Sequence, residues 1–176
     1  MNTECPLCDH ECLNPVELEP GLNAWWCSAC DGHWIPDSAY RAWEPERSGE
    51  GTEEEPARPV DSRDAKICRD CGRIMLRFPA GGDPSFHVDR CGACGGVWLD
   101  GREWQALKQR GLHAELPRVF SETWQKQLRE DHYRRHLEAR LESRLGRNDY
   151  ATVRAFRRWL AGREDLSLIL AYLERP

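Results

Sequence analysis

The sequence predicts a small, metal-stabilised α+β protein in which two β-hairpin modules precede an all-α C-terminal region of about three helices. Three observations lead to this prediction. Four CxxC pairs occur in the first hundred residues, in two sets with almost equal internal spacing. Apolar residues after position 104 recur at the three- and four-residue intervals of amphipathic helices. The mean hydropathy of -0.75 is too low for a single large core, so small modules are expected.

The cysteines belong to a tandem repeat. The first copy reads CPLC, 18 residues, CSAC and DGHW, and the second reads CRDC, 19 residues, CGAC and GGVW. Each spacer is long enough for a strand, a turn and a second strand. In the second copy AGGDPS (80–85) supplies the turn, and FHVDR (86–90) alternates as a strand does. The pattern therefore predicts two β-hairpins with a CxxC turn at each end.

The paired CxxC turns indicate metal binding. One CxxC turn places two thiolates on the same side of a tight loop, and two such turns complete the tetrahedral four-thiolate shell that Zn²⁺ prefers. The sequence lacks a secretory signal and an apolar run of about 18 residues, so we expect a cytoplasmic protein in which disulfides are disfavoured. We therefore predict two zinc ions per chain, with these ligands: Cys5, Cys8, Cys27 and Cys30 for one, and Cys68, Cys71, Cys91 and Cys94 for the other.

Two alternatives to zinc remain open at this point, namely an iron–sulfur cluster or other metal, and redox-active thiols. A thioredoxin-like dithiol would be a lone CxxC at the start of a helix in a βαβ context, and no such pattern surrounds these pairs. Cys12 is left over and is expected not to be a ligand. The histidines near the cysteines are not expected to ligate either, because each set of four is complete: His10, His33 and His87.

Several residues around the second CxxC of each copy have expected structural roles. Trp34 and Trp98 follow the last cysteine of their copies by four residues, and each is expected to cover the preceding metal loop. Trp25 and Trp26 are adjacent on a strand and therefore face opposite ways, so one of them should be exposed. Glycines after the cysteines should adopt positive φ: Gly32, Gly95 and Gly96. Acidic residues should cap the following helices: Asp37, Asp100 and Glu103.

The segment between the copies, residues 44–66, is rich in Glu, Pro and Gly, with Val60 as its only large apolar residue. Such a segment buries too little surface to offset its ordering entropy, which favours a flexible acidic linker. A long surface loop over a fused pair of repeats is the alternative. The expected organisation is zinc ribbon 1 at 1–43, the linker at 44–66, zinc ribbon 2 at 67–104 and the helical region at 105–176.

The helical region contains residues that are typical of helix starts and ends. Pro117 is expected to lead into a long helix that ends at Gly146, Asn148 or Asp149 to cap a second helix, and Asp165 to cap a third. Charge separates this region from the repeats: residues 1–100 contain 9 Lys+Arg and 19 Asp+Glu, whereas residues 101–176 contain 16 and 11. An acidic and a basic part indicate physically different modules.

The second copy resembles the bacterial transcription-factor-IIB-type zinc-ribbon family, whose pattern is CxxC, a short β-hairpin, CxxC-G-G-x-W-L-D and a nearby Glu. The matching residues are Cys68, Cys71, Cys91, Cys94, Gly95, Gly96, Trp98, Leu99, Asp100 and Glu103. The first copy matches at Cys5, Pro6, Cys8, Cys27, Cys30, Gly32 and Trp34. It departs at Asp31, Ile35 and Pro36, and its Asp37 comes one place late. The resemblance implies a zinc-ribbon fold, and the family is named for a ribbon that docks on polymerase through protein contacts.

These features favour a non-enzymatic zinc-binding adaptor or regulator that acts through protein–protein interaction, with the transcription machinery as a candidate partner. The alternative is a nucleic-acid-binding regulator that uses the Arg-rich helical tail. Against it, acidic residues alternate with the arginines, as on a salt-bridged solvated face: Glu130, Asp131, Glu138 and Glu142.

Catalysis and membrane binding are not expected. The sequence contains no GxSxG, HExxH or P-loop motif. His132 and His136 have the spacing of two metal ligands on a helix, but Tyr133 stands where HExxH has Glu, and no third ligand is evident. A protein partner is therefore expected and a membrane is not, while the oligomeric state is left undetermined.

Overall fold

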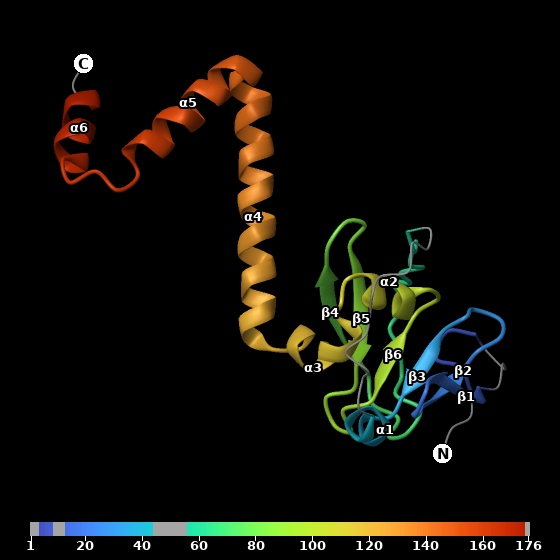
Figure 1. The fold of residues 1–176 in the computed structure, drawn as a ribbon. Helices are drawn as coiled ribbons and strands as arrows, with labels where there is room; N and C mark the ends of the chain where they lie inside the picture. The colour runs from blue at the N-terminus through green and yellow to red at the C-terminus, as the bar shows by residue number, and fades with distance from the viewer. Residues whose placement is uncertain (1–3, 9–12, 44–55, 175–176) are drawn as a thin grey trace. The chain divides into compact units, whose positions relative to one another are not determined.

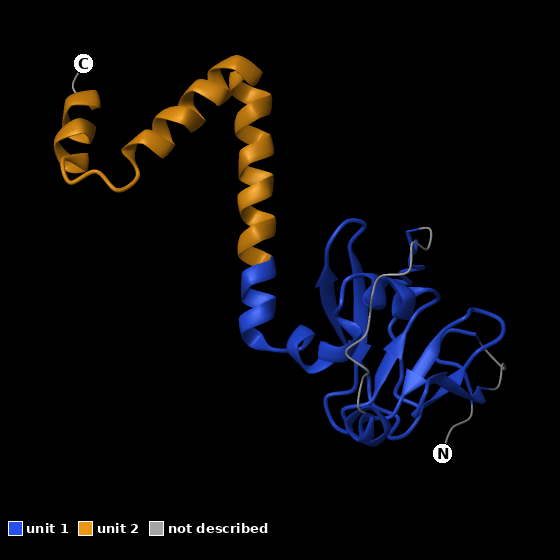
Figure 2. Ribbon diagram, in the orientation of Figure 1, with its two compact units in different colours: residues 1–128 blue, residues 129–176 orange. Residues whose placement is uncertain are grey.

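The structure, a computed structural model, describes residues 4–8, 13–43 and 56–174 (Figure 1). The chain divides into two compact units, residues 1–128 and residues 129–176 (Figure 2). The first unit contains both cysteine repeats on antiparallel strands, and the second is helical. The predicted α+β class, with two cysteine-bearing hairpin modules and a helical C-terminal region, is confirmed.

Both repeats contribute to one six-stranded antiparallel sheet in the order β1-β2-β3-β6-β5-β4. The first repeat supplies β1 (Asn14–Glu19), β2 (Leu22–Trp26) and β3 (His33–Ile35), and the second supplies β4 (Leu76–Gly81), β5 (Phe86–Arg90) and β6 (Val97–Leu99). The repeats join where β3 pairs with β6, and Trp34 lies opposite Trp98 in that pair. From either edge of the sheet inward, the strands of a repeat follow in chain order, and the two third strands pair at the centre. This arrangement is expected for two copies related by an approximate two-fold axis.

The two faces of the sheet bury different groups, because successive residues of a strand point to opposite sides. One face packs against α2 (Glu103–Gln109) and α3 (Leu116–Val119) and forms an apolar core that includes Ile35, Leu99 and Leu107. On the other face the two tryptophans pack with the cysteines in a second buried cluster. The cysteine groups thus share a core with the junction of the repeats.

The junction depends on reciprocal contacts between tryptophan and glycine. A methyl group added at Gly96 would lie 2.2 Å from the Trp34 ring, and one added at Gly32 would lie 2.3 Å from the Trp98 ring. Each tryptophan therefore packs on the glycine that follows the cysteines of the other repeat. The expectation that each would cover the loop of its own copy missed this exchange. Gly32 and Gly96 are needed because a tryptophan ring approaches their backbone closely. The prediction that they adopt positive φ is wrong.

A buried polar network fixes the second repeat. The Lys66 ammonium lies 2.8 Å from an Asp89 oxygen and 3.1 Å from an Asp100 oxygen, and its side chain is fully buried. The Trp98 indole N–H donates to Asp100 at 2.7 Å. Glu103 accepts the backbone N–H of Asp100 at 2.8 Å. Asp100 therefore orients Trp98, and it does not cap α2, whose N-cap residue is Arg102.

The segment 56–66 is attached to the second repeat. The Val60 N–H donates to the Gly101 carbonyl at 2.8 Å, and the Ser62 N–H donates to the Asp100 carboxylate at 2.8 Å. Residues 44–55, the remainder of the predicted linker, lie outside the described residues. The compact units differ from the predicted segments, since both repeats fall in one unit and its boundary lies within α4.

Several predicted helix boundaries are wrong. The helix α1 (Asp37–Ala42) begins at Asp37, which pairs with Arg41 at 2.6 Å and is not an N-cap. The long helix α4 (Glu122–Leu145) is separate from the short α3 that contains Pro117. It ends before Gly146, as predicted, but Gly146 itself is the N-cap of α5 (Arg147–Leu160). Asp165 occupies the N-cap position of α6 (Leu166–Leu173) without a side-chain cap hydrogen bond.

Among the residues that the structure describes, no helix has the length and apolar character needed to cross a bilayer.

The Trp–Gly contact predicts that Gly96→Ala destabilises the repeats severely. The added methyl has no space beneath the Trp34 ring, so we expect the free energy of unfolding to fall by at least about 2 kcal/mol. Gly92→Ala is the matched control in the same loop, because its added methyl would meet only the Leu76 side chain, at 3.6 Å. Denaturant unfolding of the metal-loaded chain measures both. Equal midpoints for the two variants would contradict the contact.

The buried Glu103 predicts a pH-dependent stability. Burial, with the nearby Asp100 charge, raises the pKa of Glu103 from 4.5 to about 9. The folded state thus retains a proton that the unfolded state releases, and this contribution to stability is lost as pH rises through that interval. Glu103→Gln should therefore gain stability relative to the unmutated chain between pH 5 and 9, by at most about 1.4 kcal/mol per pH unit.

Chemical denaturation at several pH values tests this prediction. Glu122→Gln, at an exposed position in α4, is the control. A constant difference between Glu103→Gln and the unmutated chain across the pH range would show that Glu103 is ionised in the folded state.

Candidate metal centres

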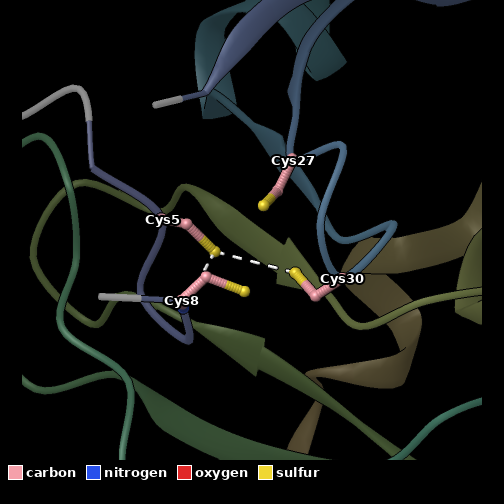
Figure 3. A group of neighbouring side chains, drawn as sticks. All are labelled: Cys5, Cys8, Cys27 and Cys30. Carbon is pink, nitrogen blue, oxygen red and sulfur yellow. Dashed lines mark hydrogen bonds between the residues drawn. The ribbon is translucent and has the colours of Figure 1, made fainter. Parts of the chain in front are cut away.

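Two groups of four cysteines converge in the first unit, and Figure 3 shows the sulfurs of the first group pointing toward one another. Within each group the ligand atoms all lie within 4.8 Å of one another. The structure brings together all eight cysteines proposed as ligands: Cys5, Cys8, Cys27 and Cys30, and Cys68, Cys71, Cys91 and Cys94. In each repeat one CxxC pair precedes the first strand, and the other lies in the turn before the third strand.

The separations between sulfurs suit one tetrahedral ion in each group. Cys5 and Cys30 are 3.7 Å apart, Cys68 and Cys94 are 3.5 Å apart, and Cys71 and Cys91 are 3.4 Å apart. Four thiolates at 2.3 Å from a tetrahedral ion would lie about 3.8 Å apart. A disulfide would require about 2.05 Å, and all eight cysteines are free thiols.

The backbone of each loop folds back on its first cysteine. The N–H groups of Cys27 and Cys91 donate to the carbonyls of Gly32 and Gly96, both at 2.9 Å. The residue after the second cysteine takes positive φ, 77° at Gly95, as expected. Its counterpart in the first repeat is Asp31 with φ 60°, since aspartate tolerates this region better than most residues.

The thiols of each group differ in acidity. The hydrogen bond from Cys30 lowers the pKa of Cys5 to about 5, whereas burial raises that of Cys8 to about 11. Burial also acts to raise the pKa of Cys91, but backbone N–H groups of Cys94 and Ala93 outweigh it and lower the value to about 6. In each group one thiol therefore ionises more readily than a neighbour whose pKa burial raises, Cys8 in the first group and Cys68 in the second. A bound cation would stabilise the thiolate form of all four cysteines.

The two groups differ in exposure. In the first group two cysteines are buried and two are partly buried, whereas in the second Cys71 and Cys94 are exposed. The second group is therefore the more accessible to a chelator or an alkylating reagent.

The other candidate residues lie apart from the clusters. His33 is buried in β3, where burial lowers its pKa. His87 lies 3.0 Å from an Asp61 oxygen. Trp25 and Trp26 are both partly buried, so neither is the freely exposed residue that had been expected. Cys12 and His10 lie outside the described residues.

Two buried cations near the second repeat were not anticipated from the sequence. Lys66 forms ion pairs with both Asp89 and Asp100. Arg69, inside the CRDC turn, has a side chain only 3% exposed, and its guanidinium lies 4.1 Å from the centre of the Trp25 ring in the other repeat. The sequence signal was a charged residue inside or just before a CxxC turn, and such residues usually remain in solvent.

The structure also explains where the first repeat departs from the zinc-ribbon pattern. Pro36 stands at the position equivalent to Asp100, so Trp34 lacks the partner that Trp98 has. The indole N–H of Trp34 is buried without a hydrogen-bond acceptor. The displaced Asp37 instead lies against Gly95 of the second repeat, where an added methyl would be 2.8 Å from its carboxylate.

A third group of acidic residues comprises Asp61, Asp100 and Glu103, with ligand atoms within 4.8 Å. Two of its carboxylates already have cationic partners in the protein, since Asp100 pairs with Lys66 and Asp61 pairs with Arg77. We do not assign a metal to this group.

Comparison of the chain with protein-family models, curated proteins and solved structures gives no match. The class of site therefore rests on the cysteine geometry alone.

The difference in exposure predicts an order of metal loss. A limiting amount of chelator should release metal from the second group first, because Cys71 and Cys94 are exposed. Alkylation followed by peptide mass spectrometry should then label these two cysteines well before Cys5 and Cys27. Equal labelling of both groups at partial metal loss would contradict the prediction.

Proposed function

We propose that the chain is a non-enzymatic zinc-binding adaptor or regulator, with one zinc ion in each cysteine group. The observation that carries this proposal is the closure of each group, with four sulfurs close enough to surround a single ion. Four cysteine ligands leave no open coordination position, and such closed sites stabilise folds. Zinc would supply a redox-inert charge that holds four thiolates together.

Zinc is favoured over an iron–sulfur cluster by the sulfur separations. A multi-iron cluster binds its cysteines through different iron atoms and would spread the sulfurs further apart than the 3.4 to 3.7 Å seen here. The two sites should also support each other. Since Trp34 and Trp98 each pack on the other repeat, loss of either metal would loosen the contact that both repeats share.

A pocket of about 470 Å³ supports a role in protein binding. It lies between β3, β6, α1 and α3, with apolar walls formed by Ile35, Val97 and Phe120 and with Arg41 and Arg90 among its lining residues. An apolar side chain flanked by a carboxylate would match this lining, with the carboxylate meeting Arg90 or displacing Asp37 from Arg41. The resemblance to transcription-associated ribbons makes RNA polymerase the first partner to test.

Nucleic-acid binding is the second candidate, and the tail gives it less support. Arg134 pairs with Asp131 at 2.5 Å, and Arg163 pairs with Asp165 at 2.8 Å. Phosphates would have to compete with these carboxylates. The Glu and Asp excess of residues 1–100 would repel them as well.

Native mass spectrometry of the reduced full chain, followed by binding to purified bacterial RNA polymerase, tests both parts of the proposal. We expect two zinc ions per chain, lost together with folded structure on chelation. The zinc-loaded chain should be retained by immobilised polymerase. Arg41→Glu should weaken this retention at least about tenfold, on the order of the loss of one interfacial charge.

The matched control is Arg118→Glu, another exposed arginine in an ion pair, but outside the pocket lining. Iron or fewer than two metals in the native spectrum would overturn the zinc assignment. Retention unaffected by Arg41→Glu would overturn the pocket as the contact. Binding to DNA in place of polymerase would favour the second candidate.

A further inference from the structure

The helical unit has no core of its own within its described residues, 129–174. None of these residues is buried. Large apolar side chains are exposed along all three of its helices: Tyr133, Leu137, Leu141, Leu145, Val153, Phe156, Trp159, Leu166, Leu168, Leu170, Tyr172 and Leu173. Helices of this length draw most of their stability from packing an apolar face, so an external surface is needed here.

The helix α5 has three arginines opposite its apolar side, whereas Arg157 and Asp149 lie on or beside that side. At roughly 100° per residue, Val153, Phe156 and Leu160 lie on one side, with Trp159 at the border. The rings of Phe156 and Trp159 stack with their centres 5.4 Å apart, and Trp159 is 51% exposed. The opposite side carries arginines and no acidic residue: Arg147, Arg154 and Arg158.

The arginines of α5 differ from those of α4. In α4, acidic and basic residues alternate and form ion pairs such as Arg134–Asp131. In α5 the one acidic residue is Asp149, in the first turn. Within the described chain no ion pair joins an acidic group to Arg154, Arg157 or Arg158. These three guanidinium groups therefore face solvent with their charge uncompensated.

The helix α6 adds further exposed apolar side chains. Its sequence, LSLILAYL, has no charged residue. Leu168 is 73% exposed and Leu173, on another side of the helix, is 54% exposed. A single flat protein face would cover only one of these sides.

We propose that α5 and α6 form a docking surface for an anionic lipid bilayer. The apolar side of α5 and the side chains of α6 would enter the interfacial region, and the arginines of α5 would meet the lipid phosphates. Helix α5 has the design of an interfacial helix, with low mean hydropathy, arginines on one side and Trp and Phe toward the other. The proposal departs from the sequence-based expectation that no membrane is involved, and it does not depend on the proposed partner of the repeats.

Two other occupants, a second copy of the chain and nucleic acid, would each cover either the apolar or the basic side chains but not both. A second copy of the chain could cover Phe156 and Leu160, but would leave three arginines uncompensated. Nucleic acid could pair with the arginines, but would leave the apolar side of α5 and all of α6 in water. An anionic bilayer offers both negative charge and an apolar phase within one interface.

Vesicle flotation with the zinc-loaded full chain tests the proposal. Vesicles of phosphatidylcholine alone are compared with vesicles that contain about one third phosphatidylglycerol. We expect binding to the anionic vesicles to be at least about tenfold stronger and to weaken with added salt. The triple variant Arg154→Gln, Arg157→Gln, Arg158→Gln should lose at least about tenfold in binding.

Two further variants separate charge from apolar contact. Phe156→Ser with Trp159→Ser should abolish binding to anionic vesicles although all arginines remain. The control Arg134→Gln, Arg140→Gln, Arg144→Gln removes the same charge from α4 and should bind nearly as the unmutated chain does. Zinc content and the unfolding midpoint of each variant show that the repeats remain folded.

Three outcomes would overturn the proposal. One is the absence of flotation with anionic vesicles at low salt. Another is equal loss of binding in the α4 and α5 charge variants, which would indicate non-specific attraction. The third is a dimer in analytical ultracentrifugation that the Phe156→Ser, Trp159→Ser variant disrupts and that does not bind vesicles, which would assign the surface to a second copy.

Discussion

The packing of Trp34 on Gly96 and of Trp98 on Gly32 is the contact on which the rest of the first unit depends. The two tryptophans face each other across the β3–β6 pair and lie in the same buried cluster as the cysteines. An indole can approach a backbone this closely only where no Cβ intervenes. The glycines are therefore constrained by the neighbouring repeat as much as by their own loop, and two modules too small to stand alone share one sheet.

The two repeats have diverged around this junction. In the second repeat Asp100 binds the indole N–H of Trp98 and the Lys66 ammonium, and it also holds the segment 56–66 through the Ser62 N–H. In the first repeat Pro36 stands at the equivalent position, and the indole N–H of Trp34 has no acceptor. An Asp-to-Pro difference thus explains why the polar network, and with it the attachment of the preceding segment, occurs on one side of the junction.

The two units solve the problem of a small core in different ways. The first unit combines a shared sheet, buried tryptophans and two clusters of free thiols whose geometry suits metal ions. The second has amphipathic helices but no buried residue among those described. Metal ions bound by the thiols would replace apolar contacts that so small a unit lacks. A helical unit with exposed leucine and arginine faces needs a surface that satisfies both.

The repeat spacing was sufficient to group the eight cysteines and to place the two hairpins, and helical periodicity with the charge balance separated a basic tail from the acidic repeats. These properties are local, because CxxC turns, strand alternation and helical periodicity each depend on residues that are close together in the sequence. The exchange of tryptophans, the pairing of β3 with β6 and the burial of Lys66 and Arg69 were decided only by the tertiary structure. Each of them depends on residues far apart in the sequence, and nothing in the pattern around Trp34 specifies that its neighbour is Gly96 of the other copy.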